Sequence, residues 1–213
     1  MGSNGTTHAD GDDPPVTAAL ERRTQHGRLL DGMAQTVARR GYAATPVAEV
    51  LKVAGVSRRT FYEQFADKED CFLAAYDAIV ALCTERLVAG YHAGERWEDG
   101  IARAYDALLR TLAGEPCFAH LGVVEVLAAG PRALARRERT LRRFARFIDH
   151  TRERADTAVA PPPLVGQAIV GGIHELVYSR IVRGEAAALP RLTDELLHYT
   201  FMLLGVSAAP AGG

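Results

Sequence analysis

Apolar residues recur at every third or fourth position through most of the chain, which is the spacing of one face of an α-helix. No segment of useful length alternates apolar and polar residues as a half-buried strand would. The pattern therefore predicts an all-α protein of about nine helices. The first clear stripe, from Leu30 to Ala38, ends at Gly41, a residue type common just past a helix. Gly27 and Gly32 lie inside this first helix, where alanine would be more favourable by roughly 1 kcal/mol each, so we expect close helix crossing there.

Two short helices are predicted after this first one. Thr45-Pro46 supplies a helix cap followed by proline at the first helical position. The apolar stripe of this second helix consists of Val47, Val50, Leu51 and Ala54. Gly55-Val56 predicts a tight turn, and Ser57 caps a third helix that extends to about Phe65. Two short helices joined by a glycine-containing turn are typical of a helix-turn-helix unit.

Longer amphipathic helices follow this unit. One begins near Asp67-Lys68, and the others cover about residues 97–113, 116–129, 131–156, 163–184 and 190–205. Residues 1–15 are too poor in apolar side chains to order themselves and predict a disordered tail. The chain therefore divides into that tail, a helix-turn-helix domain over 16–70 and a larger helical domain over 71–213.

Composition narrows the function classes. The formal net charge of −1 argues against a protein that coats nucleic acid indiscriminately, although residues 21–70 carry nine Lys or Arg against seven Asp or Glu. Three cysteines without Cys-x-x-Cys spacing fit a reducing compartment. No apolar run approaches the roughly 18 residues of a membrane span, and the first residues are acidic and polar, unlike a secretory signal. We expect a cytoplasmic protein that does not associate with membranes.

Enzymatic motifs are absent from the sequence. None of the four serines lies in a Gly-x-Ser-x-Gly setting, and there is no Gly-x-x-x-x-Gly-Lys phosphate loop. His120 and His174 have no second ligand at metal spacing. We therefore expect no catalytic residues, no cofactor and no metal; a helical hydrolase, transferase or protein-binding scaffold is the rival interpretation.

The third helix presents chemistry suited to DNA. In helical projection Phe61 and Phe65 face the second helix, whereas Arg59, Tyr62 and Glu63 face outward. Arginine can bind guanine through two hydrogen bonds in the major groove, and hydroxyl groups bind phosphate oxygens. The amino ends of the second, third and fourth helices add N–H groups suited to phosphate.

The gapless segment "AGVSRRTFYEQFADKE" resembles the DNA-binding region of TetR-family transcriptional regulators, and the resemblance extends over about residues 22–80. It implies that Thr45 and Lys68 contact DNA phosphates and that Ser57, Thr60 and Tyr62 hold the DNA backbone. It also implies that Gln64 makes a contact with DNA at the flank of the recognition helix. It also implies that Arg58 and Arg59 reach bases. Arg59 stands where the family usually has a small residue, and Glu63 places an anion near DNA, so Arg59 either reads a base edge or binds a phosphate.

The family resemblance assigns effector binding and dimerisation to residues 71–213. Candidates for an effector cavity between helices are Tyr105, Cys117, Phe118, Leu121, Glu125, Phe144, His174 and Tyr178, although core packing or exposure is the commoner role for such residues. Candidates for the dimer interface are Ile169, Ile173, Leu176, Val177, Ile181, Leu192, Leu196, Tyr199 and Leu203, which otherwise close the monomer's core. Seven arginines crowd residues 132–146; a solvated helix face is the favoured interpretation over a second nucleic-acid surface or an anion-binding wall.

These expectations combine into one hypothesis. A homodimer binds a palindromic operator, and a small-molecule effector favours a conformer in which the recognition helices no longer match successive major grooves, so that a repressor is released. An activator and a ligand-independent DNA binder are the alternatives.

Overall fold

The structure, a computed structural model, describes residues 24–152 and 162–206, so the tail predicted over residues 1–15 lies outside the described residues. Within these ranges all regular structure is helical, which confirms the all-α prediction. The α-helices are α2 (Gln25–Arg40), α3 (Val47–Ala54), α4 (Arg58–Gln64), α5 (Lys68–His92), α6 (Trp97–Gly114), α7 (Pro116–Val123), α8 (Pro131–Arg152), α9 (Val165–Val182) and α10 (Thr193–Leu204). Two short 3₁₀ helices, η1 (Glu125–Leu127) and η2 (Ala186–Leu192), complete the set.

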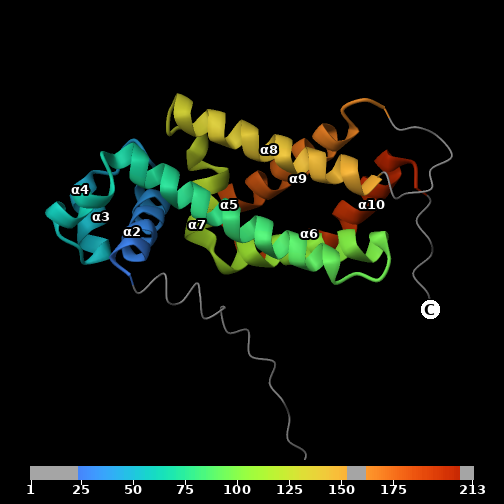
Figure 1. Cartoon of the computed structure of the whole chain (residues 1–213), viewed down its shortest axis with the longest axis horizontal. Helices are drawn as coiled ribbons and strands as arrows, with labels where there is room; N and C mark the ends of the chain where they lie inside the picture. Colours follow the sequence, from blue (N-terminus) through green and yellow to red (C-terminus); the bar gives the residue numbers. More distant parts are fainter. Residues whose placement is uncertain (1–23, 153–161, 207–213) are drawn as a thin grey trace, which may run out of the picture.

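The helices form a small unit and a larger bundle. Figure 1 shows α2, α3 and α4 gathered at one end of the elongated molecule, with α6, α8, α9 and α10 forming the bundle beyond them. Helix α5 starts beside α4 and continues into the bundle. It therefore crosses the domain boundary predicted at residue 70 without a break, and the small unit and the bundle share one rigid element.

Two hydrophobic cores correspond to these two parts. The first joins α2, α3 and α4 to the start of α5 and to α7, and its fully buried side chains include Met33, Phe61, Phe72 and Leu121. The second lies among the end of α5 and helices α6, α8, α9 and α10, with Ile101, Leu109 and Ile148 among its buried members. Burying a side chain of this size contributes about 1.5–3 kcal/mol, so each core is able to hold its helices together.

Two predicted helices are shorter than expected. The helix expected over 116–129 ends at Val123, and residues 125–127 form η1 instead. The helix expected from Pro190 starts at Thr193, because Pro190 lies inside η2. Proline lacks the N–H that an α-helix needs in its interior, which favours the tighter helix there.

Candidate nucleic-acid interface and ligand cavity

Helix α4 is fixed at both ends and along one side. Gly55 adopts the left-handed conformation (φ 62°) that ends α3 and turns the chain. The Ser57 hydroxyl accepts the Thr60 N–H at 3.1 Å and caps α4. Phe61 and Phe65 are buried against α2 and α3. The opposite side of α4 is consequently held outward on a rigid support.

The outward side carries the residues predicted to contact DNA. Arg58, Arg59 and Gln64 are exposed, and the Tyr62 side chain is 50% exposed with its ring edge against Phe61. The helix thus presents guanidinium, phenol and amide donors together, the donor types that bind base edges and phosphates in a major groove.

Arg59 has a partner within the helix. Its Nε donates to Glu63 Oε1 at 2.8 Å, and the two side chains are 90% and 55% exposed. An exposed ion pair at this spacing contributes only about 0.3–0.5 kcal/mol, so a guanine or phosphate can displace Glu63 from Arg59 at little cost.

Two predicted phosphate contacts sit differently from expectation. Thr45 is buried, its hydroxyl donates to Gly41 O at 2.8 Å, and its N–H donates to Tyr42 O at 3.2 Å. Thr45 therefore locks the turn between α2 and α3 rather than facing solvent, which corrects the expected role; Pro46 occupies the cap position instead. Lys68 Nζ donates to Tyr42 O at 3.0 Å and lies 4.2 Å from the centre of the Tyr42 ring, so it packs on the same turn.

Tyr42 and His26 were missed by the sequence reasoning. Tyr42 is the common partner of Thr45 and Lys68, and the His26 Nδ1 atom lies 2.9 Å from Gln64 Oε1. The available signal for Tyr42 was its position, since an aromatic residue stands directly after Gly41, the residue that ends α2. Nothing in the local pattern pairs His26 with Gln64, because 38 residues separate them.

The N-terminal unit matches a family model. Residues 29–75 match bacterial regulatory proteins of the tetR family, over the segment that builds α2, α3, α4 and the start of α5. The N-terminal unit of the chain therefore resembles that of tetR-family regulators. No curated protein sequence matches it.

Solved structures extend the likeness to the whole fold. The fatty acid degradation regulator FadR from Bacillus halodurans superposes with a TM-score of 0.72 at 18% identity, covering 92% of this chain and 97% of that one. FadR from Bacillus subtilis, solved in complex with stearoyl-CoA, gives a TM-score of 0.72 at 17% identity over 85% of this chain and 100% of that one. Reduced NemR from Escherichia coli gives 0.64 at 18% identity over 87% and 100%. At these identities the likeness establishes the fold of the chain alone.

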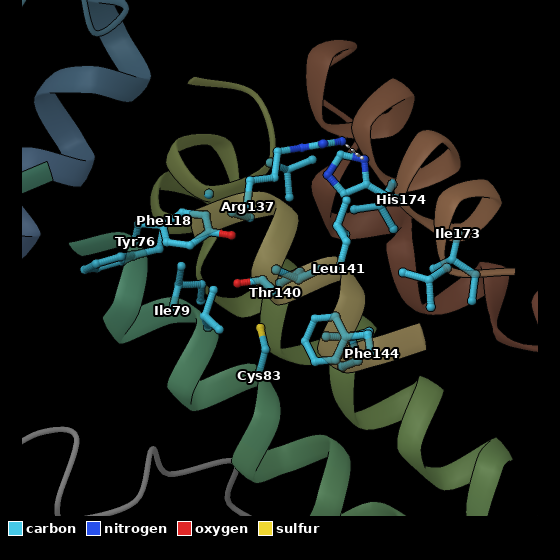
Figure 2. A pocket seen from close by; sticks show the side chains of 18 residues that line it. Tyr76, Ile79, Cys83, Phe118, Arg137, Thr140, Leu141, Phe144, Ile173 and His174 are labelled. Atoms are coloured by element: carbon cyan, nitrogen blue, oxygen red, sulfur yellow. Dashed lines mark hydrogen bonds between the residues drawn. The ribbon is translucent and has the colours of Figure 1, made fainter. Parts of the chain in front are cut away.

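A cavity of about 100 Å³ lies within the helical bundle, and its lining is mostly apolar. Figure 2 shows its walls coming from helices on several sides. The lining residues are Tyr76, Ile79, Val80, Cys83, Leu108, Leu112, Phe118, Ala119, Gly122, Val123, Arg137, Thr140, Leu141, Phe144, Val170, Ile173, His174 and Val177.

Three of the predicted effector residues line this cavity: Phe118, Phe144 and His174. Five do not: Tyr105, Cys117, Leu121, Glu125 and Tyr178. Their positions on the helices explain the correction. Tyr105 is buried on another side of α6, with its hydroxyl 2.9 Å from Thr200 Oγ1, and Leu121 belongs to the first core. Cys117 and Tyr178 pack at the edges of the two cores.

Glu125 has a different role from the one expected. Its Oε2 accepts the Tyr42 N–H at 2.7 Å, and its Oε1 lies 3.4 Å from His120 Nε2. Glu125 therefore ties η1 of the bundle to the turn after α2. No local pattern predicts a hydrogen bond across 83 residues.

The polar part of the lining consists of Tyr76, Arg137, Thr140 and His174. Of these four, the sequence analysis predicted only His174 as an effector contact. Burial, reinforced by the positive charge of Arg137, lowers the pKa of His174 to about 4, so its ring is neutral at pH 7. Burial raises the pKa of Tyr76, an effect that a hydrogen bond to Thr140 and nearby arginines oppose. Arg137, Thr140, Leu141 and Phe144 recur at helical spacing along α8, and that stripe was the available signal.

The predicted dimer residues divide into two groups. Ile169, Val177, Ile181, Leu192 and Leu196 are buried in the monomer's own core, and Ile173 lines the cavity. Ile169, Ile173 and Leu196 also line a groove between α9 and α10. Leu176, Tyr199 and Leu203 are 41%, 52% and 44% exposed. Together with Met202 they form an apolar face on α9 and α10, around this groove of about 300 Å³.

Among the described residues, no group of three or more His, Cys, Asp or Glu side chains is placed to hold a metal ion. Over the same ranges no single helix is long and apolar enough to cross a membrane; only the pair Pro116–Leu127 and Pro131–Thr151, bent by 113°, meets that test jointly.

Proposed function

We propose that this chain is a homodimeric repressor that binds a palindromic operator through α4 and is released when a small molecule with an apolar body enters the bundle cavity. The observation that carries the proposal is the position of α7, which contributes to both the cavity wall and the core of the DNA-binding unit. A ligand that moves α7 therefore acts on both.

The two faces of α7 support this coupling. Phe118, Ala119, Gly122 and Val123 line the cavity, whereas Leu121 is fully buried in the core that it shares with α2 and α4. Interiors are close-packed, so α7 cannot shift on one side without displacing what it touches on the other. A ligand that binds one position of α7 more tightly than another then shifts the whole unit toward that position.

Glu125 lies directly after α7 and adds a second connection. Its hydrogen bond to the Tyr42 N–H links η1 to the turn on which Thr45 and Lys68 converge. That turn leads into α3, which supports α4. A displacement of α7 is thereby carried toward the recognition helix along hydrogen-bonded and packed groups.

The apolar face on α9 and α10 supports the dimer. Gly171 and Gly172 lie on the exposed side of α9, where an added Cβ would meet no atom within 4 Å. Glycine costs about 1 kcal/mol relative to alanine in a helix, so the monomer gains nothing from either residue. Close backbone approach by a second copy accounts for them, and burial of Leu176, Tyr199, Met202 and Leu203 would accompany it.

The stearoyl-CoA complex of the B. subtilis neighbour supports an effector site within this fold. The apolar lining of the cavity agrees with an effector that has an apolar body. Dimer geometry supplies the switch, since two recognition helices must lie about 34–36 Å apart to enter successive major grooves.

The test begins with selection of bound duplexes from random DNA by the full-length protein. We expect enrichment of a palindrome, and the affinity for it should fall steeply as salt rises. Retention of no palindrome at low salt would contradict the operator proposal. Addition of the identified effector should then lower the affinity; an increase would favour an activator, and no change would favour a ligand-independent DNA binder.

Substitutions on α4 separate the proposed roles. Tyr62→Phe should weaken binding to all sequences, because it removes a phosphate contact, whereas Arg59→Ala should relax the preference at one base pair, a loss of about 1–3 kcal/mol in discrimination. Arg103→Ala, an exposed arginine on α6, is the matched control and should change neither. Uniform loss from both α4 variants would contradict this division.

A further inference from the structure

Arg137 is the one cationic side chain that lines the cavity. It extends from α8, and Figure 2 shows its guanidinium reaching the His174 ring, while the Tyr76 and Thr140 side chains belong to another part of the same lining. Its Nη2 lies 3.4 Å from His174 Nδ1, and its Nε is buried with no hydrogen-bond partner. A buried donor without an acceptor costs about 1–3 kcal/mol, more when the group is charged, so this arrangement requires an explanation.

Three neighbouring arginines on α8 form ion pairs. Arg132 contacts Glu69 and Asp70, Arg136 contacts Asp77, and Arg142 contacts Glu138. No carboxylate in the described part of the chain forms an ion pair with Arg137, and its one polar neighbour, His174, is neutral at pH 7 because its pKa is lowered to about 4. The polar end of the cavity therefore carries an uncompensated positive charge.

An arginine side chain stays protonated in proteins, so it cannot relieve this cost by losing its proton. The remaining means is an anion, and the planar guanidinium binds a carboxylate through two parallel hydrogen bonds. The Tyr76 hydroxyl lies in the same lining and is able to turn from Thr140 to donate to a carboxylate oxygen, whereas the Thr140 hydroxyl donates to Arg136 O at 3.1 Å. The rest of the wall is apolar and offers no polar group to a second charged end.

We propose that the effector of this cavity is a small carboxylic acid with a compact apolar body, whose carboxylate binds Arg137 and whose body packs among Ile79, Phe118 and Phe144. The inference rests on the proposed effector site and names its chemical class. The cavity of about 100 Å³ is smaller than the roughly 150 Å³ that accommodates benzene, so a short alkyl chain is the body that fits best. A phenyl ring or a longer alkyl chain enters only if the walls of the cavity move apart.

The test is direct calorimetric binding to the full-length protein without DNA, using pairs of ligands that differ only in charge. Benzoate should bind about tenfold to a hundredfold more tightly than benzamide, and hexanoate should exceed hexanamide by the same factor, because each amide lacks the charged hydrogen bonds. Equal affinity for acid and amide, or no binding of either acid, would overturn the proposal. Since wild-type protein suffices, this result does not depend on whether a variant folds.

Variants then locate the charge. Arg137→Gln should abolish the preference for acid over amide, while Arg142→Gln, on the exposed side of the same helix, should retain it. A preference that survives Arg137→Gln in a folded protein would refute the assignment to Arg137. Hexanoyl-CoA is the last ligand to be tested. It lacks the free carboxylate, so it should bind no more tightly than hexanamide. If hexanoyl-CoA bound tenfold more tightly than hexanoate, the proposal would also be overturned.

Operator release is measured separately from these affinities. If benzoate or hexanoate binds in the Arg137-dependent manner but leaves DNA affinity unchanged, the repressor mechanism fails and the carboxylate site stands. If the acids do not bind while DNA binding persists, the carboxylate site fails and the DNA-binding assignment stands.

Discussion

Replacement of Gly32 by alanine tests whether close approach of α2 and α3 positions the recognition helix. A Cβ at residue 32 would lie 2.9 Å from Val50 O, 3.0 Å from Ala54 Cβ and 3.1 Å from Ala54 N. Two of these three atoms are backbone, so α3 has to shift by several tenths of an ångström to relieve the contacts. This crossing agrees with the expectation that glycine in the first helix permits close packing at residue 32.

The magnitude follows from two opposing effects. Alanine is favoured over glycine in a helix by about 1 kcal/mol. Overpacking a tight core costs about 1–3 kcal/mol, and here the neighbour is backbone that has no alternative rotamer. We expect Gly32→Ala to lower the free energy of unfolding by up to about 2 kcal/mol and to weaken DNA binding, since α3 supports α4 through Phe61.

Urea unfolding of the full-length protein, at one fixed protein concentration, measures the first effect, and duplex binding measures the second. Gly114→Ala is the matched control, because an added Cβ at this helical residue in α6 meets nothing within 4 Å. That variant should be neutral or slightly more stable. If Gly32→Ala were also more stable than the wild type and bound DNA as well, the close crossing would not constrain α3, and the reasoning would fail.

Three other experiments test the coupling, the cavity and the dimer face. Glu125→Ala should cost about 1.5–3 kcal/mol of stability, because it removes the charged hydrogen bond to Tyr42 N–H, and should reduce the factor by which effector changes operator affinity; an unchanged factor would exclude this connection. His174 has a pKa of about 4 in the folded state, below the value of 6.5 that is usual for an exposed ring, so the unfolded state binds its proton first and stability should fall as pH drops from about 6.5 to 4. Urea unfolding of His174→Leu should show a shallower loss over that window, and an identical pH profile would contradict the burial argument. Leu176→Arg or Tyr199→Arg should shift sedimentation toward the monomer, and an undisturbed dimer would place the interface elsewhere.

Local features of the DNA-binding unit were readable from the sequence because short-range rules govern them. Gly41 and Gly55 end α2 and α3 in positive-φ conformations, and Ser57 caps α4, as their positions predicted. The outward placement of Arg59 and Tyr62 followed from helical periodicity alone. Periodicity describes which residues share a face. On a short helix with one buried side, that information is nearly sufficient to predict which side chains face outward.

The bundle was less predictable, since almost every helix there has neighbours on more than one side. Tyr105 and His174 both lie on apolar stripes. Tyr105 nevertheless forms a hydrogen bond with Thr200, whereas His174 lines the cavity, because α6 and α9 turn different faces to the cavity. Likewise Val177 is buried within the monomer whereas Leu176, the adjacent residue, is exposed. A stripe in the sequence cannot distinguish the core of one chain from the contact between two.

The sequence by itself determined the helices, their caps and the outward chemistry of α4, because these depend on residues within one or two turns of each other. Only the tertiary structure decided that Thr45 faces inward, that Glu125 reaches Tyr42, and that Arg137 meets His174 beside an apolar cavity. Each of the last two contacts joins residues at least 37 positions apart, and their energies depend on burial and on which partners are brought within reach, quantities that no local pattern contains.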